Sequence, residues 1–384
     1  MALMKRNVGP IGIDVSDHTM EIAQLRAVVV GKTATVHGYA RNVFAPGIIK
    51  DGRLLKAQEF KELVRGMLSN PDYGNFDTKS VVLAMPEHQC YHHVFTLNTI
   101  GDDRLLYNVV QEKLVASIPF DIAEMLWDWM VVRQDGAVVV VYAVAMRRDV
   151  VESYMEALRS LGLIVRAVEP QVYSASRVFW PNLILEEPVV FCDLGTSETS
   201  VSTIDDYGIH QSSIQSYGLW QIEETLMKQL RVDRATAEKL ARSIGLRKLN
   251  HPKIADIHSA IKGHLKDLVE EVQQHISYYH VQRHARPGTL SQLVITGGGS
   301  LIPGVPEVLA NSLKLQLRSQ KEHTLYQPAF SPDDFALYVN GLGAARRDVN
   351  SEQDDINVLV TRRQHDTKPQ SWWSRFTQRT SKQA

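Results

Sequence analysis

The amino-acid sequence predicts an α/β protein with two similar lobes and a small inserted subdomain. An apolar strand, an aspartate, a tight turn and a second strand occupy residues 11–22, and the same order recurs at residues 189–204. Between and after these stretches, strand-like runs alternate with segments of helical periodicity. The repeat and the alternation together indicate a duplicated α/β fold.

Composition places the chain among ordinary globular proteins. It has 384 residues, with 42 Lys and Arg against 43 Asp and Glu, so its formal net charge is −1. A nearly neutral chain favours no nucleic-acid partner. Its length indicates two or three lobes rather than one.

The cysteines and the apolar runs bear on location. Cys90 and Cys192 are far apart and match no zinc or disulfide spacing, which fits a reducing cytoplasm. The first residues lack the apolar core of a signal peptide, and no run approaches the roughly 20 apolar residues that span a bilayer. We expect a cytoplasmic protein that is soluble or lies on a membrane surface.

The first half reads as strands and helices in a regular order. Three short strands open it, with turns near residues 16–17 and 31–32, and helical spacing follows at residues 57–70. The run "KSVVLAMP" at residues 79–86 has the continuous apolar character of a strand covered on both faces. An amphipathic helix that stops at Pro119, two strands and a further helix complete this half.

The second half repeats this opening after a short linker. Three strands lead to a long helix near residues 254–284, a strand that ends in "TGGG" and a last helix at residues 332–347. From Asp348 the chain turns polar. We expect residues 348–384 to form a linker and tail.

Three turns carry residues suited to a nucleotide. Asp14 and Asp193 end apolar strands beside small turns, where a carboxylate holds magnesium through its waters while turn amides face a phosphate. Gly195 lets the backbone approach a phosphate without a Cβ clash. The third turn, "TGGGSLIPG", offers backbone amides where a helix begins. Each turn alone is common, but the three in this order are specific.

This ordered set resembles the actin-like ATPase superfamily, in which two phosphate hairpins and an adenosine loop enclose a nucleotide between two lobes. The stretches "VVLAMPEHQCYHHVFTL", "VVQEKLVASIPFD" and "ATAEKLARSIGL" narrow the resemblance, because they follow the order seen in the type IV pilus assembly PilM family. The resemblance covers residues 12–346. It implies a two-lobed, ribonuclease H-like duplicated actin fold with the inserted subdomain of PilM and FtsA proteins.

The same resemblance divides the chain into segments. They are a first lobe in two parts (1–78 and 151–187), the inserted subdomain (79–150), a second lobe with the adenosine loop (188–347) and the tail (348–384).

The resemblance also implies a ligand, ATP or ADP with magnesium. The residues that it places around the nucleotide are Asp14, Ser16, Asp193, Gly195, Thr196, Glu238, Lys239, Gly297, Gly298 and Gly299. Asp14 and Asp193 would hold magnesium through water. Glu169 matches an acidic position that orients magnesium-bound water, which makes it the candidate catalytic residue. Glu238 and Lys239 fit a solvated helix face nearly as well.

The first hairpin departs from the family pattern. PilM-like sequences place a glycine at Ser16, a small residue at Asp17 and a lysine at Glu21. If Asp17 faces the phosphates, like charges 4 Å apart repel by about 4 kcal/mol at an effective dielectric of 20. If Asp17 points outward, only a flexible glycine is lost. We expect nucleotide binding with weak or absent hydrolysis.

By resemblance, the protein is a cytoplasmic scaffold of the type IV pilus machine, peripheral to the inner membrane. It would bind the cytoplasmic N-terminal segment of a PilN-like inner-membrane protein and couple it to the motor ATPase complex. A groove near Ile118, Pro119 and Phe120 is the candidate site for that peptide. The alternatives are an FtsA-like, membrane-tethered filament protein and, with less support, a kinase of the same superfamily.

The tail combines aromatic and basic residues. Trp372, Trp373 and Phe376 lie close together, with Arg375 and Arg379 beside them. Tryptophan with a basic rim suits an anionic membrane surface. Docking on a protein partner explains the same residues, so both readings stay open.

Overall fold

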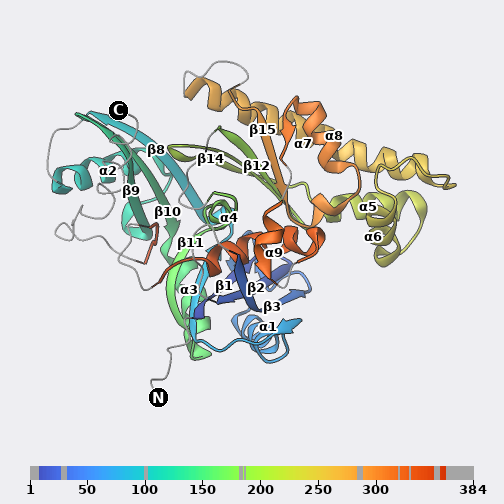
Figure 1. The fold of residues 1–384 in the computed structure, drawn as a ribbon, viewed down its shortest axis with the longest axis horizontal. Coiled ribbons are helices and arrows are strands. Elements are labelled where there is room, and N and C mark those ends of the chain that lie inside the picture. The colour runs from blue at the N-terminus through green and yellow to red at the C-terminus, as the bar shows by residue number, and fades with distance from the viewer. Residues whose placement is uncertain are drawn as a thin grey trace.

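The computed structural model describes residues 8–26, 33–98, 103–180, 185, 187–282, 289–318, 321–327, 330–349 and 355–359. These residues form two lobes, each built on a sheet, and a subdomain with a sheet of its own. Figure 1 shows the first lobe around β1–β3 below, the second lobe around β12 and β15 above, and the subdomain with β8–β10 at the upper left. The predicted two-lobed α/β architecture is confirmed.

One sheet organises the first lobe. Its order is β11-β7-β1-β2-β3-β17, with β1, β2 and β3 antiparallel and with β7 and β11 parallel to β1. Its main strands are β1 (Val8–Val15), β2 (Thr19–Arg26), β3 (Ala34–Val43), β7 (Ser80–Met85) and β11 (Ile164–Pro170). The short strands are β4 (Ile49–Lys50), β5 (Arg53–Leu54), β6 (Tyr73–Gly74), which pairs with β3, and β17 (Tyr326–Gln327). Helices α1 (Ala57–Ser69) and α3 (Arg148–Ser160) pack together and complete this core.

The second lobe repeats this plan. Its order is β14-β13-β12-β15-β16, with an antiparallel meander of three strands and with β15 and β16 parallel to β12. Its strands are β12 (Val189–Leu194), β13 (Thr199–Asp205), β14 (Gly208–Gln215), β15 (Gln292–Thr296) and β16 (Gln316–Leu317). Its helices are α5 (Leu219–Leu230), α6 (Arg234–Ser243), α7 (Ile254–Gln282) and α8 (Val305–Leu313). The series β3-β2-β1-β7-β11 therefore has a counterpart strand for strand, as the internal repeat predicts.

Two helices lie between the sheets: α4 (Gln171–Phe179) and α9 (Pro332–Ala345) (Figure 1). Helix α9 begins after Ser331, whose hydroxyl accepts a hydrogen bond from the Asp334 amide at 3.0 Å. A Cβ atom at Gly343 would lie 1.8 Å from the Ser174 carbonyl oxygen. The glycine therefore permits backbone contact between α9 and α4, and α9 also packs along β1 and β2.

The inserted subdomain has its own small core. Its sheet, in the order β8-β10-β9, consists of β8 (Cys90–Asn98), β9 (Met125–Asp135) and β10 (Val138–Arg147), and α2 (Asp103–Ser117) covers it. We predicted that this unit begins at residue 79, but β7 pairs with β1 and β11 inside the first-lobe sheet. The inserted sheet therefore begins at Cys90, and the apolar run before it is a central strand.

The segment after α9 differs from the expected tail in one place. Ile356 and Val358 are 0% and 1% exposed, so residues 355–359 pack against the body instead of belonging to a solvated linker. Trp372, Trp373 and Phe376 lie outside the described residues.

Candidate functional site

A cleft lies between the two lobes at the carboxyl ends of β1 and β12. Its walls come from the β1–β2 and β12–β13 turns, from α4 and α9, and from the glycine turn after β15. Of the predicted nucleotide residues, those that line it are Asp14, Ser16, Asp193, Gly195, Thr196, Gly297 and Gly298. Three turns far apart in the sequence thus meet at one place.

Asp14 and Asp193 meet at the base of this cleft. The side-chain amide of Asn340 donates to both, at 3.1 Å to Asp14 Oδ2 and 3.0 Å to Asp193 Oδ2. Gln171 on α4 donates to Asp14 Oδ1 at 2.6 Å. Burial raises the pKa of Asp14 well above its usual range, and Glu21 and Asp193 add to the effect. Burial also raises the pKa of Asp193. Two carboxylates held this close attract a cation.

The surroundings of the pair fit a hydrated magnesium ion. Magnesium keeps several waters and uses one or two carboxylates in most protein sites. The Asn340 Oδ1 atom is buried and has no hydrogen-bond partner among the described residues. A metal-bound water would supply that missing donor, so Asp14, Asp193 and Asn340 form a suitable set.

Glu21 and Arg41 extend the row of charges into the first lobe. In the strand register Asp14 pairs with Glu21, and Glu21 pairs with Arg41. The Arg41 Nε atom lies 2.8 Å from Glu21 Oε1. Burial raises the pKa of Glu21 to about 7, although Arg41 acts in the opposite direction. Arg41 is the one cationic side chain among the described residues that line the cleft.

The β1–β2 turn satisfies its own amides. The Ser16 hydroxyl accepts hydrogen bonds from the backbone amides of Thr19 at 3.0 Å and His18 at 3.5 Å. Successive turn amides of this kind are the groups that bind a phosphate in anion-binding turns. The serine oxygen occupies them within the hairpin.

The sequence does not show whether the Asp17 side chain faces the cleft, and in the structure it points outward. Its carboxylate accepts hydrogen bonds from the backbone amides of Asp51 at 2.7 Å and Gly52 at 3.0 Å. These amides belong to the turn between β4 and β5. The carboxylate therefore fastens a neighbouring turn and is not among the residues that line the cleft.

The β12–β13 turn is built differently. The Gly195 amide donates to the Glu198 carbonyl at 2.9 Å, and a Cβ atom at Gly195 would lie 2.8 Å from that oxygen. A side chain at this position would open the turn. Thr196 lines the cleft, and the buried Thr199 hydroxyl donates to the Tyr217 carbonyl, which fixes the following strand.

The three glycines after β15 have different roles. Gly297 has φ +79°, and a Cβ atom there would lie 2.3 Å from Asp193 Oδ1. At Gly299 a Cβ atom would lie 2.9 Å from the Leu194 Cβ. Both glycines let the turn pack on the end of β12, and Gly299 is not among the residues that line the cleft. Gly298 lines the cleft, and its nearest side-chain neighbour, Arg242, would be 3.7 Å from a Cβ atom. Gly297 also lines the cleft, but of the three glycines only Gly298 would accept a Cβ atom without a close contact.

Two contacts connect a turn of one lobe to a helix of the other. The rings of His18 and Trp220 lie 3.7 Å apart between centroids. His88, in the short helix η1 (Glu87–Gln89), lies 3.0 Å from the Glu198 carboxylate. These contacts connect the two lobes beside the cleft.

The sequence comparison identifies the family behind this geometry. The pattern of the family described as type IV pilus assembly protein PilM matches residues 12–321. This chain belongs to the PilM family. No curated protein sequence matches it significantly.

Solved structures show the same fold. The PilM–PilN type IV pilus biogenesis complex matches with a TM-score of 0.73 at 18% identity, over 90% of this chain and 100% of that chain. EutJ from Carboxydothermus hydrogenoformans, an ethanolamine utilization protein, matches with a TM-score of 0.54 at 12% identity, covering 88% of this chain and 89% of that one. MreB5 of Spiroplasma citri, bound to AMPPNP, matches with 0.51 at 12% identity, covering 86% and 94%. The actin-like fold is thereby confirmed.

None of the described helices is long and apolar enough to cross a membrane.

Glu238 and Lys239, which were predicted to lie near the nucleotide, are both on α6. Glu238 is bound to Arg242 on the same helix at 2.9 Å, and Lys239 is exposed. Neither residue lines the cleft, while Arg242 reaches toward the Gly298 carbonyl at 3.5 Å. In this arrangement Arg242 is closer to the glycine turn than the two predicted residues.

Glu169 lies in a buried ion-pair cluster. Its oxygens accept hydrogen bonds from Arg177 at 2.6 and 3.0 Å, from Ser174 at 2.6 Å and from Arg347. It is fully buried and does not line the cleft. These contacts suit a structural anchor for α4, and a role in orienting water stays a prediction.

The candidate peptide groove is only partly open. Ile118 is buried in a small cluster with Met125, Pro119 is exposed, and Phe120 lies under the Arg147 guanidinium at 4.9 Å from its ring centroid. A hollow lies close by, bounded by Tyr107, Met125, Leu126, Trp127, Asp128, Trp129, Arg148 and Val358. This hollow is therefore a concave surface next to the predicted groove.

Sequence reasoning missed Asn340, Gln171 and Arg41. Asn340 stands among apolar neighbours on α9, whereas Gln171 opens α4, a helix that also contains serines and an arginine. Arg41 reaches the cleft only through the pairing of β2 with β3. A polar residue on an otherwise apolar helix face was the available signal for Asn340, and no comparable signal marked Gln171.

Proposed function

We propose that this chain is a nucleotide-binding scaffold of the type IV pilus assembly machine. Its ligand is ATP or ADP with magnesium, bound between the lobes. The observation that carries the proposal is the convergence of Asp14, Asp193 and Gly298 on one cleft in a chain of the PilM family. The fold neighbour MreB5 bound to AMPPNP supports a nucleotide at this place in the fold.

Each residue has a distinct task in this proposal. Asp14 and Asp193 hold magnesium through its waters, and Asn340 orients them. Arg41, steadied by Glu21, supplies the positive charge that the missing lysine of the first hairpin would give. The amides of the second hairpin face the phosphates, and Gly298 leaves room for the nucleoside.

Hydrolysis is weak or absent in this reading. The first hairpin uses its amides internally, and both oxygens of Glu169 are engaged by arginines. A carboxylate held in this way accepts no proton from water without breaking ion pairs.

Calorimetry tests the nucleotide proposal. Magnesium-ATP should bind the wild type, and Gly298→Arg should remove binding because the side chain fills the open space beside the turn. Gly263→Arg is the matched control, since nothing lies within 4 Å of a Cβ atom there. Turnover near the ~10 per second median of enzymes would contradict a scaffold role. Equal binding by wild type and Gly298→Arg would place the nucleotide elsewhere.

The protein partner in this proposal is a PilN-like inner-membrane protein, which presents its cytoplasmic N-terminal segment. The fold neighbour described as a PilM–PilN complex supports that choice. Through this segment the chain would connect to the motor ATPase complex. A tagged peptide with the partner's N-terminal sequence should retain the full chain, and a peptide of scrambled sequence should not.

A location beside the inner membrane completes the proposal, with the chain cytoplasmic. We expect the tail residues Trp372, Trp373 and Phe376 to add reversible attraction to anionic lipid. Co-sedimentation with anionic vesicles should fade in high salt and disappear when residues 371–384 are deleted. Protection of the tail by the partner peptide, without sedimentation, would make it a protein-docking element. Nucleotide-dependent polymers on the vesicles would favour the FtsA-like alternative.

A further inference from the structure

Residues 355–359 lie in the angle between the first lobe and the inserted subdomain. They follow α9 by a short stretch and have no helix or strand structure. On one side they contact β11, the edge strand of the first-lobe sheet, and on the other they contact β9. In Figure 1 this red end of the chain reaches back toward the inserted strands. We call residues 355–359 the docked segment.

The side chain of Asn357 forms hydrogen bonds with the backbone of β11. Its Oδ1 atom accepts from the Val168 amide at 3.1 Å, and its amide nitrogen donates to the Arg166 carbonyl at 3.1 Å. The next residue, Val358, donates its backbone amide to the Val168 carbonyl at 3.2 Å. One of these bonds joins main chains and two come from the Asn357 side chain, so the segment lies along the edge of β11, where extended peptides are commonly recognised.

Side chains on either side of Asn357 fix the position. Ile356 and Val358 are buried, at 0% and 1% exposure, within the main hydrophobic core. The backbone amide of Asn357 donates to Asp128 Oδ2 on β9 at 2.8 Å. The docked segment therefore has two aliphatic anchors around one asparagine.

An acidic residue begins the docked segment. The Asp355 carboxylate accepts from Tyr173 and, at 3.2 Å, from Arg177, and it lies 3.5 Å from Arg347. The two arginines outweigh the effect of burial and lower the pKa of Asp355. The receiving surface thus selects an acidic residue, an aliphatic residue, an asparagine and a second aliphatic residue, in that order.

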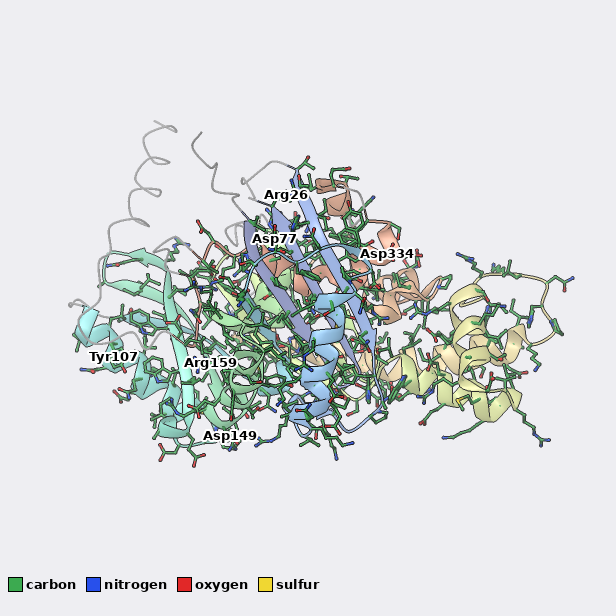
Figure 2. The ribbon with its side chains drawn as sticks, turned by 90° about the horizontal axis from the view of Figure 1, so that it is seen from below. Arg26, Asp77, Tyr107, Asp149, Arg159 and Asp334 are labelled. Atoms are coloured by element: carbon green, nitrogen blue, oxygen red, sulfur yellow. The ribbon has the colours of Figure 1, made fainter. Side chains whose placement is uncertain are left out.

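The receiving surface continues beyond the docked segment. Val358 borders the hollow that Tyr107, Trp127 and Arg148 also line. Figure 2 labels Tyr107 on α2, at the end of the molecule away from α5–α7. A longer peptide in the same position would extend over this aromatic and basic hollow.

We propose that the docked segment is an intramolecular ligand, which occupies a binding site for an extended partner peptide with the same acidic–aliphatic–Asn–aliphatic pattern. The inference rests on the proposed binding of a partner segment and adds where it binds and what it must displace. The partner's peptide and residues 355–359 compete for the edge of β11. Partner binding releases the chain that follows residue 359.

The covalent link between the docked segment and α9 determines how strongly the segment competes with a free peptide. A segment on a short linker has an effective concentration of about 1 mM at its own site. A free peptide that binds the vacant site at about 10 μM would then appear about 100-fold weaker against the intact chain.

The test uses the full chain and a labelled synthetic peptide with residues 352–361 of this sequence. The wild type should bind it about 100-fold more weakly than full-length Ile356→Asp, in which a buried charge undocks the segment. Leu249→Asp, at an exposed aliphatic position, is the matched control and should behave as the wild type. A peptide with alanine in place of Asn357 should bind the Ile356→Asp chain at least tenfold more weakly than the original peptide.

A folded Ile356→Asp chain that does not bind the peptide would overturn the proposal. If that variant fails to fold, hydrogen exchange on the wild type decides instead. The amides of Asn357 and Val358 should exchange well before those of β11, because the segment opens locally. Exchange at the rate of β11 would make the segment a fixed part of the lobe and overturn the inference.

A peptide of the PilN-like partner separates this inference from the proposed function. Tighter binding to Ile356→Asp than to the wild type supports both. Equal binding to the two proteins keeps the proposed partner and overturns the competition. If the partner peptide binds neither protein while the self-peptide still distinguishes them, the proposed partner is wrong and the intramolecular site stands.

Discussion

The two hairpins that face each other across the cleft share a register and differ in chemistry. Asp14 pairs with Glu21 across β1 and β2, and Asp193 pairs with Ser200 across β12 and β13. In each hairpin the two members of the pair are seven positions apart in the sequence. Ser16 stands where the second hairpin has Gly195. The duplicated hairpins thus differ at two matched positions: the first has Ser16 and Glu21, and the second has Gly195 and Ser200.

This difference indicates which of the two hairpins is better suited to bind a phosphate. The second hairpin places Gly195, Thr196 and Ser197 along the cleft and has Ser200 at the position of Glu21. Its Glu198 also lines the cleft, where the carboxylate pairs with His88. In the first, the Ser16 hydroxyl occupies turn amides, and Glu21 holds the nearest positive charge, Arg41. Binding therefore depends chiefly on the second hairpin and the glycine turn, while the first contributes Asp14 and magnesium.

The largest expected effect comes from removing the charge of Glu21. Because burial raises its pKa to about 7 from an ordinary 4.5, the folded state binds this proton more tightly than the unfolded state. Stability contributed by the protonated form is therefore lost as pH rises from about 4.5 to about 7. At pH 8, Glu21→Gln should raise the free energy of unfolding by about 3 kcal/mol.

Chemical denaturation at pH 4 and pH 8 checks this prediction. The gain should vanish at pH 4, and Glu112→Gln on the exposed surface of α2 should show neither change. A gain of the same size at both pH values would mean that packing, not ionisation, distinguishes the two hairpins.

Exchanging the turn residues should move nucleotide affinity in opposite directions. Ser16→Gly frees the amides of His18 and Thr19 for a phosphate, and Gly195→Ser forces the second turn open against the Glu198 carbonyl. We expect Ser16→Gly to bind magnesium-ATP about tenfold more tightly and Gly195→Ser to bind it about tenfold more weakly. Each change corresponds to about 1.4 kcal/mol. Calorimetry measures both, with Ser277→Gly on α7 as a control. Unchanged affinity in Ser16→Gly would show that the first turn does not approach the phosphates.

Sequence patterns predicted the repeat because it is local. Each hairpin consists of two apolar strands and a turn within about a dozen residues, so alternation and turn residues define it directly. The run at residues 79–86 was correctly identified as a strand covered on both faces, but no local pattern shows which sheet contains it. We assigned it to the inserted subdomain, and this was wrong because β7 pairs with β1 and β11 in the first-lobe sheet.

The remaining features depend on contacts between distant residues. Asp17 meets the amides of Asp51 and Gly52, more than thirty positions away, so its direction is not visible in "VSDHT". The docked segment was missed because five residues between polar stretches resemble a linker. Its burial depends on β11 and β9, which only the fold brings together.

A smaller effect is expected at Asp17. Asp17→Ser removes the acceptor of two backbone hydrogen bonds, which should cost about 1 kcal/mol of unfolding free energy. Magnesium-ATP affinity should stay unchanged, since the carboxylate points away from the cleft. Asp17→Asn, which keeps one oxygen, should lose less stability. Tighter binding by Asp17→Ser would instead show that the carboxylate turns toward the phosphates when nucleotide is present.

The smallest effect concerns His88, which ties the second hairpin to the first half. Burial acts to lower the pKa of His88, but the hydrogen bond and charge of Glu198 outweigh it, with help from Asp17 and Asp51, so the pKa is raised. A histidine with a raised pKa contributes stability that is fully present below its unfolded value, near 6.5, and is lost as pH rises through the folded value.

A double-mutant cycle isolates this pair from the rest of the cleft. His88→Gln, Glu198→Gln and the double variant should give a coupling of about 0.5 kcal/mol at pH 6, because both side chains are partly solvated. As the pH is raised through the pKa of His88 in the folded state, the imidazole becomes neutral and the coupling should fall to near zero. A constant coupling across this range would make the contact a neutral hydrogen bond. The contact between η1 and the β12–β13 turn would then be independent of pH.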